Sequence, residues 1–221
     1  MPYCHVIGKA PTIKCRIGVD DLDSYEHLSE FIALVSTIAD VSHFVIHART
    51  AILGGKFSPK QNRTIPPLKY SFVYKLAHDF PHLTFSLNGG VLSIEDVEAH
   101  FRECNNHPAL AGVMVGRSAM NNPYSWRHVD SRLYGVKDVG HTRRDILSLY
   151  AMYAQTIEDT EGSKTRYSLI KPLHHLFAGS KNGKRFRCSL SENVKNRNLS
   201  MYDVVMKASD SVSDAEVLDF Y

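Results

Sequence analysis

Two short turns in this chain combine glycine with a polar or charged side chain, directly after apolar runs that predict strands. The first is Asn-Gly-Gly at residues 88–90, and the second is Gly-Arg at residues 116–117. Backbone amides with no Cβ beside them can wrap a phosphate, and a guanidinium adds a charged fork for the same anion. Such turns after consecutive strands indicate one phosphate held between them, although Asn-Gly-Gly also forms an ordinary tight turn.

Two further polar side chains belong to apolar runs earlier in the chain, Lys14 inside one and His47 at the end of another. An ammonium within a strand is costly unless it meets an anion. We therefore expect Lys14 either to face the electron-rich edge of a bound flavin or to form a salt bridge with Asp20 or Asp21. His47 lies where α/β barrels place site residues and could contact a ring or a phosphate. The alternative is a structural histidine with satisfied hydrogen bonds.

The segments that position these residues alternate between strand and helix. The predicted strands are 11–17, 44–46, 83–87 and 112–115, and the predicted helices that join them are 24–38, 68–79 and 94–104. This alternation is typical of parallel β/α architecture. Residues 51–67 form a loop that is too long for a simple connection, which makes it a functional candidate.

The predicted secondary structure changes after Gly135, where apolar residues follow helical spacing and the alternation of strands and helices ends. Residues 142–157, 168–177 and 185–194 are predicted as helices, and the tail after Ser200 is expected to hold at most one weak helix. Apolar residues of the first helix fall on one predicted face, namely Ile146, Leu149, Tyr150, Tyr153 and Ile157. We therefore expect two domains, residues 1–138 and 139–221.

Two basic clusters could contact a nucleic-acid backbone. The first lies in the long loop and comprises Lys56, Lys60 and Arg63. The second lies near the start of the predicted helix 185–194 and comprises Lys181, Lys184, Arg185 and Arg187. The alternative for each is a solvated charged face.

The amino-acid composition excludes several classes of protein. The chain is 43% hydrophobic with a net charge of +3, as in an ordinary soluble protein. Its four cysteines show no CxxC spacing, which argues against a zinc site and a disulfide framework and fits a reducing compartment. No apolar run approaches the roughly 20 residues of a membrane span. The sequence also has no GxSxG, Walker or HExxH motif.

Five motifs, taken in order, resemble the A-type branch of the flavin-dependent tRNA-dihydrouridine synthases. They are KCRIGVDD, FVIHART, SPKQNRTIPPLKY, FPHLTFSLNGG and GVMVGRSAMNNP. The similarity continues more loosely through LFAGSKNGKRFRCSLSEN, which is similar to the C-terminal helical domain of that family. The resemblance implies reduction of the C5=C6 bond of D-loop uridines, at the 20/20a site, with FMN as cofactor and NADPH as reductant.

The resemblance also implies residue roles. Flavin contacts would come from Lys14 and His47, and the FMN ribityl-phosphate would be held by Asn88, Gly89, Gly90, Gly116 and Arg117. Contacts to tRNA would come from Arg49, Lys60, Arg63, Lys184 and Arg187.

One departure concerns the catalytic acid. The family carries this cysteine in an Asn-x-Gly-Cys-Pro motif, which does not occur in these 221 residues, so no catalytic residue is assigned. The predicted strands match strands five to eight of a TIM (β/α)8 barrel, followed by a small all-helical domain. The chain is therefore expected to be a truncated form, inactive alone, that self-associates through exposed barrel edges. The expected compartment is the cytoplasm, or an organelle for a longer parent protein.

Two other functions remain open from the sequence. One is a non-catalytic tRNA-binding module, and the other is an FMN barrel oxidoreductase acting on a small molecule. The basic loop and the basic helical segment argue against the small-molecule enzyme, because a small substrate would need neither. No metal and no membrane association are expected.

Overall fold

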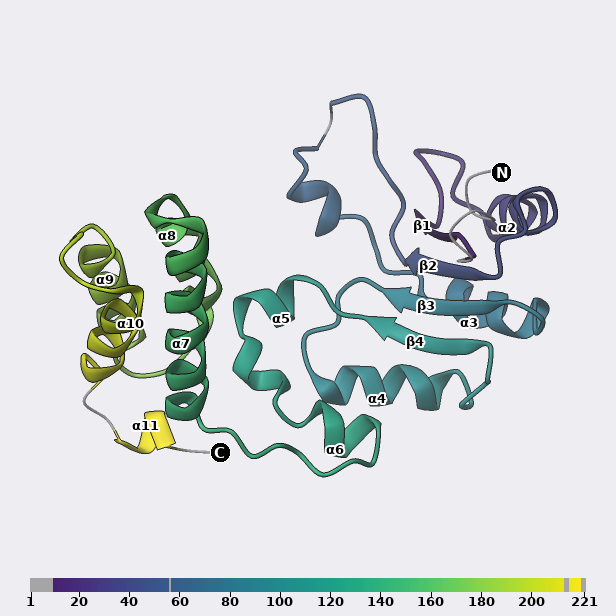
Figure 1. Cartoon of the computed structure of the whole chain (residues 1–221). Helices are drawn as coiled ribbons and strands as arrows, with labels where there is room; N and C mark the ends of the chain where they lie inside the picture. The colour runs from purple at the N-terminus through teal and green to yellow at the C-terminus, as the bar shows by residue number, and fades with distance from the viewer. Residues whose placement is uncertain (1–9, 56, 213–214, 220–221) are drawn as a thin grey trace. The chain divides into compact units, whose positions relative to one another are not determined.

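The computed structural model describes residues 10–55, 57–212 and 215–219, and four parallel strands form the sheet of its first unit (Figure 1). The strands are β1 (Thr12–Arg16), β2 (His43–His47), β3 (Thr84–Asn88) and β4 (Leu110–Met114), in the order β1-β2-β3-β4. The prediction of four parallel strands separated by helices is confirmed. Because all strands run the same way, their carboxyl ends meet at one edge of the sheet.

Three helices connect these strands: α2 (Tyr25–Ala39), α3 (Tyr70–Asp79) and α4 (Ile94–Glu103). The starts of two are fixed by side-chain caps. Ser24 Oγ accepts a hydrogen bond from the amide of His27, and Ser93 forms a capping box with Asp96. Right-handed crossovers between neighbouring parallel strands place the connecting helices on the same face of the sheet.

The two faces of the sheet differ in chemistry. The helix side is apolar and includes Phe44, Ile46, Phe85 and Leu87, each 0% exposed. The strand register gathers polar side chains on the other side, where Thr12, His43 and Thr84 share one row. There, Nδ1 of His43 lies 2.8 Å from Oγ1 of Thr84. The open face is therefore suited to polar ligands rather than to a second apolar layer.

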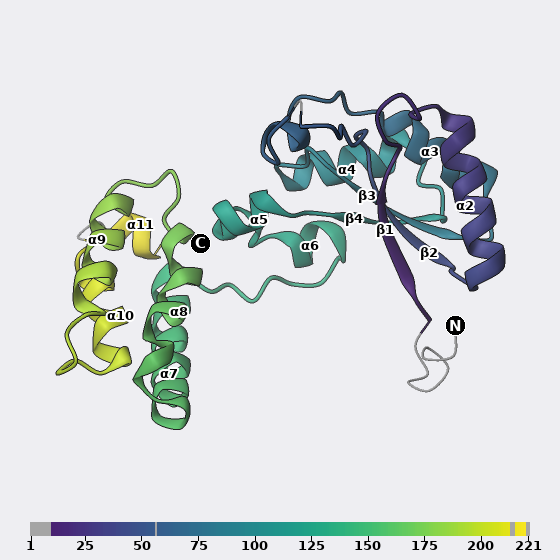
Figure 2. The same ribbon diagram turned by 90° about the horizontal axis from the view of Figure 1, so that it is seen from above.

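Contacts between residues divide the chain into two compact units, Met1–Gly116 and Arg117–Tyr221. The predicted domain boundary lies later in the sequence, after residue 138. The second unit is helical in its described part. It contains α5 (Arg117–Asn121), α6 (Val129–Leu133), α7 (Arg143–Glu161), α8 (Arg166–Ile170), α9 (Gly183–Asn193), α10 (Met201–Asp210), α11 (Ala215–Asp219) and 3-10 turns at Pro123–Trp126, Ser163–Thr165 and Lys171–His175. Helix α10 packs against both α7 and α9 (Figures 1 and 2).

Two expectations for the second unit are corrected by the structure, one of them in part. The tail holds a capped ten-residue helix, α10, rather than at most one weak helix, because Ser200 and Asp203 form a capping box and Val204 and Val205 are buried. The predicted face of α7 is right in part: Ile146, Tyr150 and Ile157 pack against the core, whereas Leu149 and Tyr153 are about half exposed. The fully buried residues of the helix are Leu147, Ala151 and Ala154, and the small alanines allow close helix approach.

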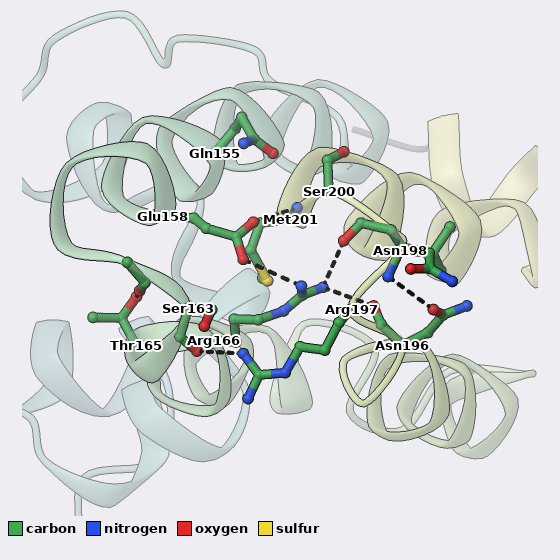
Figure 3. Close-up of polar contacts among 12 residues, drawn as sticks. Gln155, Glu158, Ser163, Thr165, Arg166, Asn196, Arg197, Asn198, Ser200 and Met201 are labelled. Atoms are coloured by element: carbon green, nitrogen blue, oxygen red, sulfur yellow. Dashed lines mark hydrogen bonds and ion pairs between the residues drawn. The ribbon is translucent and has the colours of Figure 1, made fainter.

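A buried ion pair joins the helices of this unit (Figure 3). Arg166 is 2% exposed, and its Nη1 lies 3.2 Å from Oε1 of Glu158 on α7. Its Nη2 donates to the carbonyl of Leu199 at 2.9 Å, while Oε2 of Glu158 accepts from the amide of Met201 at 3.0 Å. One charged pair therefore fixes both the segment before α10 and the first turn of α10.

Candidate functional site at the carboxyl ends of the strands

The strand register places four residues in one row at the carboxyl ends of the strands. Arg16 pairs with His47, His47 with Asn88, and Asn88 with Met114. His47 and Asn88 are thus neighbours on the polar face, as expected if both serve one site. Lys14 lies on the same face two residues earlier in β1, in register with Val45.

Asn88 forms hydrogen bonds to the chain segments on both sides of β3. Its Nδ2 donates to the carbonyl of Met114 at 2.7 Å, and its own carbonyl accepts from the amide of Ala48 at 2.9 Å. Asn88 therefore ties β3 to the ends of β2 and β4. Its side-chain oxygen remains as an acceptor for a ligand donor.

Packing explains why residues 89 and 90 are glycines. Their φ angles are +111° and +74°, which L side chains rarely adopt. A Cβ on Gly89 would lie 2.5 Å from Cδ2 of His47, and one on Gly90 would lie 2.6 Å from the Tyr70 hydroxyl oxygen. Both glycines are thus required by the fold, whether or not a phosphate binds.

The amides of this turn fit an anion. Within the described part of the chain, the backbone nitrogens of Gly89 and Gly90 donate no hydrogen bond. At Gly116, a Cβ would meet no atom within 4 Å, and φ is not positive, so the fold does not demand glycine there. Unpaired amides and open space beside a glycine are what close approach of a phosphate requires. Arg117 follows directly as the first residue of α5.

Lys14 does not form the salt bridge that was its alternative. Among the described residues, no ion pair joins Lys14 to Asp20 or Asp21, and Asp20 instead accepts from the amide of Leu53 at 2.8 Å. Partial burial lowers the pKa of the Lys14 ammonium. The Lys14 side chain is nevertheless exposed on the polar face, where it can pair with a negatively charged ligand edge.

The long loop is anchored by two residues that sequence inspection did not single out. Arg16 Nη1 donates to the carbonyls of Thr50 and Asn62, at 2.9 and 2.8 Å. The side chain of Asn62 hydrogen-bonds to both backbone groups of Ile52. The partner Asn62 lies 46 residues from Arg16, so this contact could not be predicted from local spacing.

The basic residues of this loop differ in their surroundings. Arg49 donates to the carbonyl of Pro66, which gives it a structural role. Lys60 precedes the short 3-10 turn Gln61–Arg63, Arg63 ends it, and both side chains are exposed. Burial, followed by the charges of Arg49 and Arg63, lowers the pKa of Arg16, so positive charge is concentrated here. Lys56 lies outside the described residues.

In the second unit, a basic cavity runs along α9. It has a volume of about 260 Å³ and is lined by Lys184, Arg187, Cys188, Ser191, Glu192 and Lys195. The predicted contact residues Lys184 and Arg187 therefore share one surface with Lys195, which the sequence did not suggest. Arg187, Cys188 and Ser191 follow Lys184 by three, four and seven residues, which places these four on one face of α9, and Lys195 lies two residues beyond the end of the helix.

Other features lie away from these sites. A cavity of about 340 Å³ between β1 and α2 is lined mainly by apolar residues, including Ile17, Val19, Leu28 and Phe31. Cys15, Cys104 and Cys188 are free thiols. Among the described residues, no group of three or more His, Cys, Asp or Glu side chains could hold a metal ion. In the same part of the chain, every helix is too short or too polar to cross a bilayer.

Comparison with known proteins gives consistent matches. The sequence profile of the family described as "Dihydrouridine synthase (Dus)" matches residues 5–212. The tRNA-dihydrouridine(20/20a) synthase of Shigella flexneri is 42% identical over 190 residues, which cover 86% of this chain and 53% of that protein. Proteins of the same name from Escherichia coli K12 and Vibrio cholerae are 41% and 39% identical, over 86% of this chain and 52% and 55% of their own. The chain thus spans about half the length of the curated relatives it matches.

Proposed function

Because this chain belongs to the dihydrouridine synthase family, we propose that it forms the flavin- and tRNA-binding part of a tRNA-dihydrouridine(20/20a) synthase. The observation that carries this proposal is the turn at the end of β3. There, the two glycine amides of residues 89 and 90 donate no hydrogen bond within the described chain, beside His47. Family membership supplies the chemistry, and this turn supplies a place for the phosphate of a flavin.

We assign the cofactor as FMN and the reductant as NADPH. Bound FMN, once reduced by NADPH, would supply the hydride, and a general acid the proton, that together reduce the C5=C6 bond of a D-loop uridine. Lys14 and His47 would contact the flavin from the polar face, and the phosphate would be held by Asn88, Gly89, Gly90, Gly116 and Arg117. The lowered pKa of Lys14 does not prevent this role, because a negatively charged flavin edge would favour the ammonium form.

None of the described cysteines is assigned as the catalytic acid. Cys15 lies on the helix side of β1, in register with Ile46, and burial raises its pKa to about 11. A thiol with so high a pKa is a poor proton donor near neutral pH. The general acid of the proposed reaction is therefore not placed on this residue.

At the level of architecture, we propose that β1 to β4 correspond to strands five to eight of a TIM barrel. The described part of the sheet pairs β1 only with β2 and β4 only with β3, which leaves one free edge on each. Residues 1–138 would then form the barrel part and residues 139–221 the helical tRNA-binding domain. Free edges favour self-association, which sedimentation velocity over a concentration range would detect.

The substrate proposed is tRNA. Its backbone would be contacted by Arg49, Lys60 and Arg63 in the first unit and by Lys184 and Arg187 in the second. A cytoplasmic location follows from this proposed substrate. A non-catalytic tRNA-binding module is the second candidate, favoured by the basic cavity on α9.

Genetic disruption tests the proposed function. Loss of the gene should abolish dihydrouridine at positions 20 and 20a, measured by mass spectrometry of tRNA digests. The intact gene should restore the modification, whereas a Lys14→Met version should not. Lys75→Met is the matched control, because that ammonium stacks on the ring of Tyr25 at 3.9 Å on the helix layer. Unchanged dihydrouridine at both positions after disruption would refute the proposal.

A further inference from the structure

The peptide bond between Gly89 and Gly90 has its orientation set by a distant side chain. The hydroxyl of Tyr70 donates to the carbonyl of Gly89 at 2.8 Å. A trans peptide is planar, so its N–H points away from its carbonyl. The hydrogen bond from Tyr70 therefore directs the amide of Gly90 to the opposite side, where it has no acceptor within the described chain.

Sterics alone cannot hold this orientation. The peptide is flanked by glycine on both sides, and glycine populates positive and negative φ with similar ease. A peptide flip at this bond would need changes only in the torsions of Gly89 and Gly90. The Tyr70 hydrogen bond is thus the specific interaction that selects one of two accessible orientations.

Tyr70 is itself well fixed. It begins α3, and the amide of the preceding Lys69 donates to the carbonyl of Ala48, just beyond β2, at 2.8 Å. Its ring meets that of His100 edge-on, with centroids 4.4 Å apart, and His100 is only 6% exposed. Burial raises the pKa of the Tyr70 hydroxyl, so it keeps its donor proton at neutral pH.

We propose that Tyr70 is a positioning residue that holds the Gly89 carbonyl so that the Gly90 amide donates to the phosphate of the bound flavin. This inference rests on the proposed FMN site. It assigns Tyr70 no contact with the flavin ring or the substrate. Its effect should therefore appear only for ligands that carry the phosphate.

The test compares FMN with riboflavin, which lacks the phosphate. Dissociation constants for both would be measured by flavin fluorescence on the full 221-residue chain and its Tyr70→Phe variant. That variant keeps the ring against His100 and removes only the hydroxyl. The matched control is Tyr74→Phe, whose hydroxyl bonds to His100 and Glu103 at 2.7 Å but not to the glycine turn.

We expect Tyr70→Phe to weaken FMN binding roughly fivefold to tenfold, the value of about one hydrogen bond, and to leave riboflavin binding unchanged. Tyr74→Phe should leave the ratio of the two affinities as it is. Equal loss of FMN and riboflavin affinity in Tyr70→Phe, or no loss of either, would overturn the inference while the FMN site stands. Failure of the unsubstituted chain to bind FMN would overturn the proposed function and this inference with it.

Discussion

The imidazole of His47 lies so close to Gly89 that a Cβ built on that glycine would be 2.5 Å from Cδ2 of the ring. The two residues belong to neighbouring strand ends, since His47 is in register with Asn88. This contact brings a candidate ring-binding side chain against a candidate phosphate-binding turn. It also means that the His47 ring leaves no room for a side chain at position 89.

Replacement of Gly89 by alanine should therefore disturb the fold as well as the ligand. We expect Gly89→Ala to lower the free energy of unfolding by about 1–3 kcal/mol, from the clash and the positive φ together. Urea denaturation would measure this change. Gly116→Ala should change stability by less than about 0.5 kcal/mol, because its Cβ would meet open space, yet weaken FMN binding. Equal stability losses in the two variants would contradict this account.

The buried pair of Glu158 and Arg166 should dominate the stability of the helical unit. Arg166→Ala leaves a largely buried carboxylate without its partner and should cost about 3–5 kcal/mol in urea unfolding. Arg144→Ala is the control, because Arg144 pairs with Asp219 at the surface and such pairs contribute less than about 1 kcal/mol. Combining Glu158→Gln with Arg166→Met should recover part of the loss, since no buried charge remains.

His100 should make stability depend on pH. Burial lowers its pKa below the unfolded value of 6.5, and this effect outweighs the attraction of Glu103 and Asp96. As pH falls, His100 is protonated in the unfolded chain before it is protonated in the folded chain. The stability that neutral His100 contributes to the fold is therefore present above pH 6.5 and is lost as pH falls below that value. Urea unfolding at about pH 7.5 and about pH 5.5 should show lower stability at the lower pH. His100→Gln should reduce that difference, and the exposed His82→Gln should not.

The cavity on α9 should contribute electrostatically to tRNA binding. Lys184→Ala combined with Arg187→Ala should weaken tRNA binding and lower the slope of log affinity against log salt by about 0.7–0.9 for each phosphate that these side chains neutralise. Lys207→Ala on α10 is the control, because Lys207 does not line the cavity. Filter binding at several salt concentrations measures both quantities. An unchanged slope in the double variant would show that this helix does not contact the tRNA backbone.

Local patterns predicted much of this architecture. Short apolar runs that end in polar residues marked all four strands, and the helix predicted at residues 94–104 corresponds to α4. A capping signal is also present at Ser200 and Asp203, and it explains why the tail, expected to hold at most one weak helix, holds the capped helix α10. Long-range contacts set the rest. The bond from Arg16 to Asn62 and the bond from Tyr70 to Gly89 join residues whose proximity depends on tertiary packing.

The sequence left two roles open for the glycines at positions 89 and 90, a phosphate-binding turn and an ordinary tight turn. The structure adds that His47, Leu68 and Tyr70 lie where a Cβ would be. Glycine at these positions therefore does not by itself favour a ligand, whereas the amides that donate no hydrogen bond within the described chain and the open space beside Gly116 do.

Flavin titration of the purified chain tests the central claim most directly. FMN is expected to bind to the 221-residue chain and to turn the protein yellow, and it should bind more tightly than riboflavin because the turn at residues 88–90 holds the phosphate. A colourless protein that binds neither flavin but still shifts tRNA in a gel would contradict the flavin site and identify the chain as a tRNA-binding module.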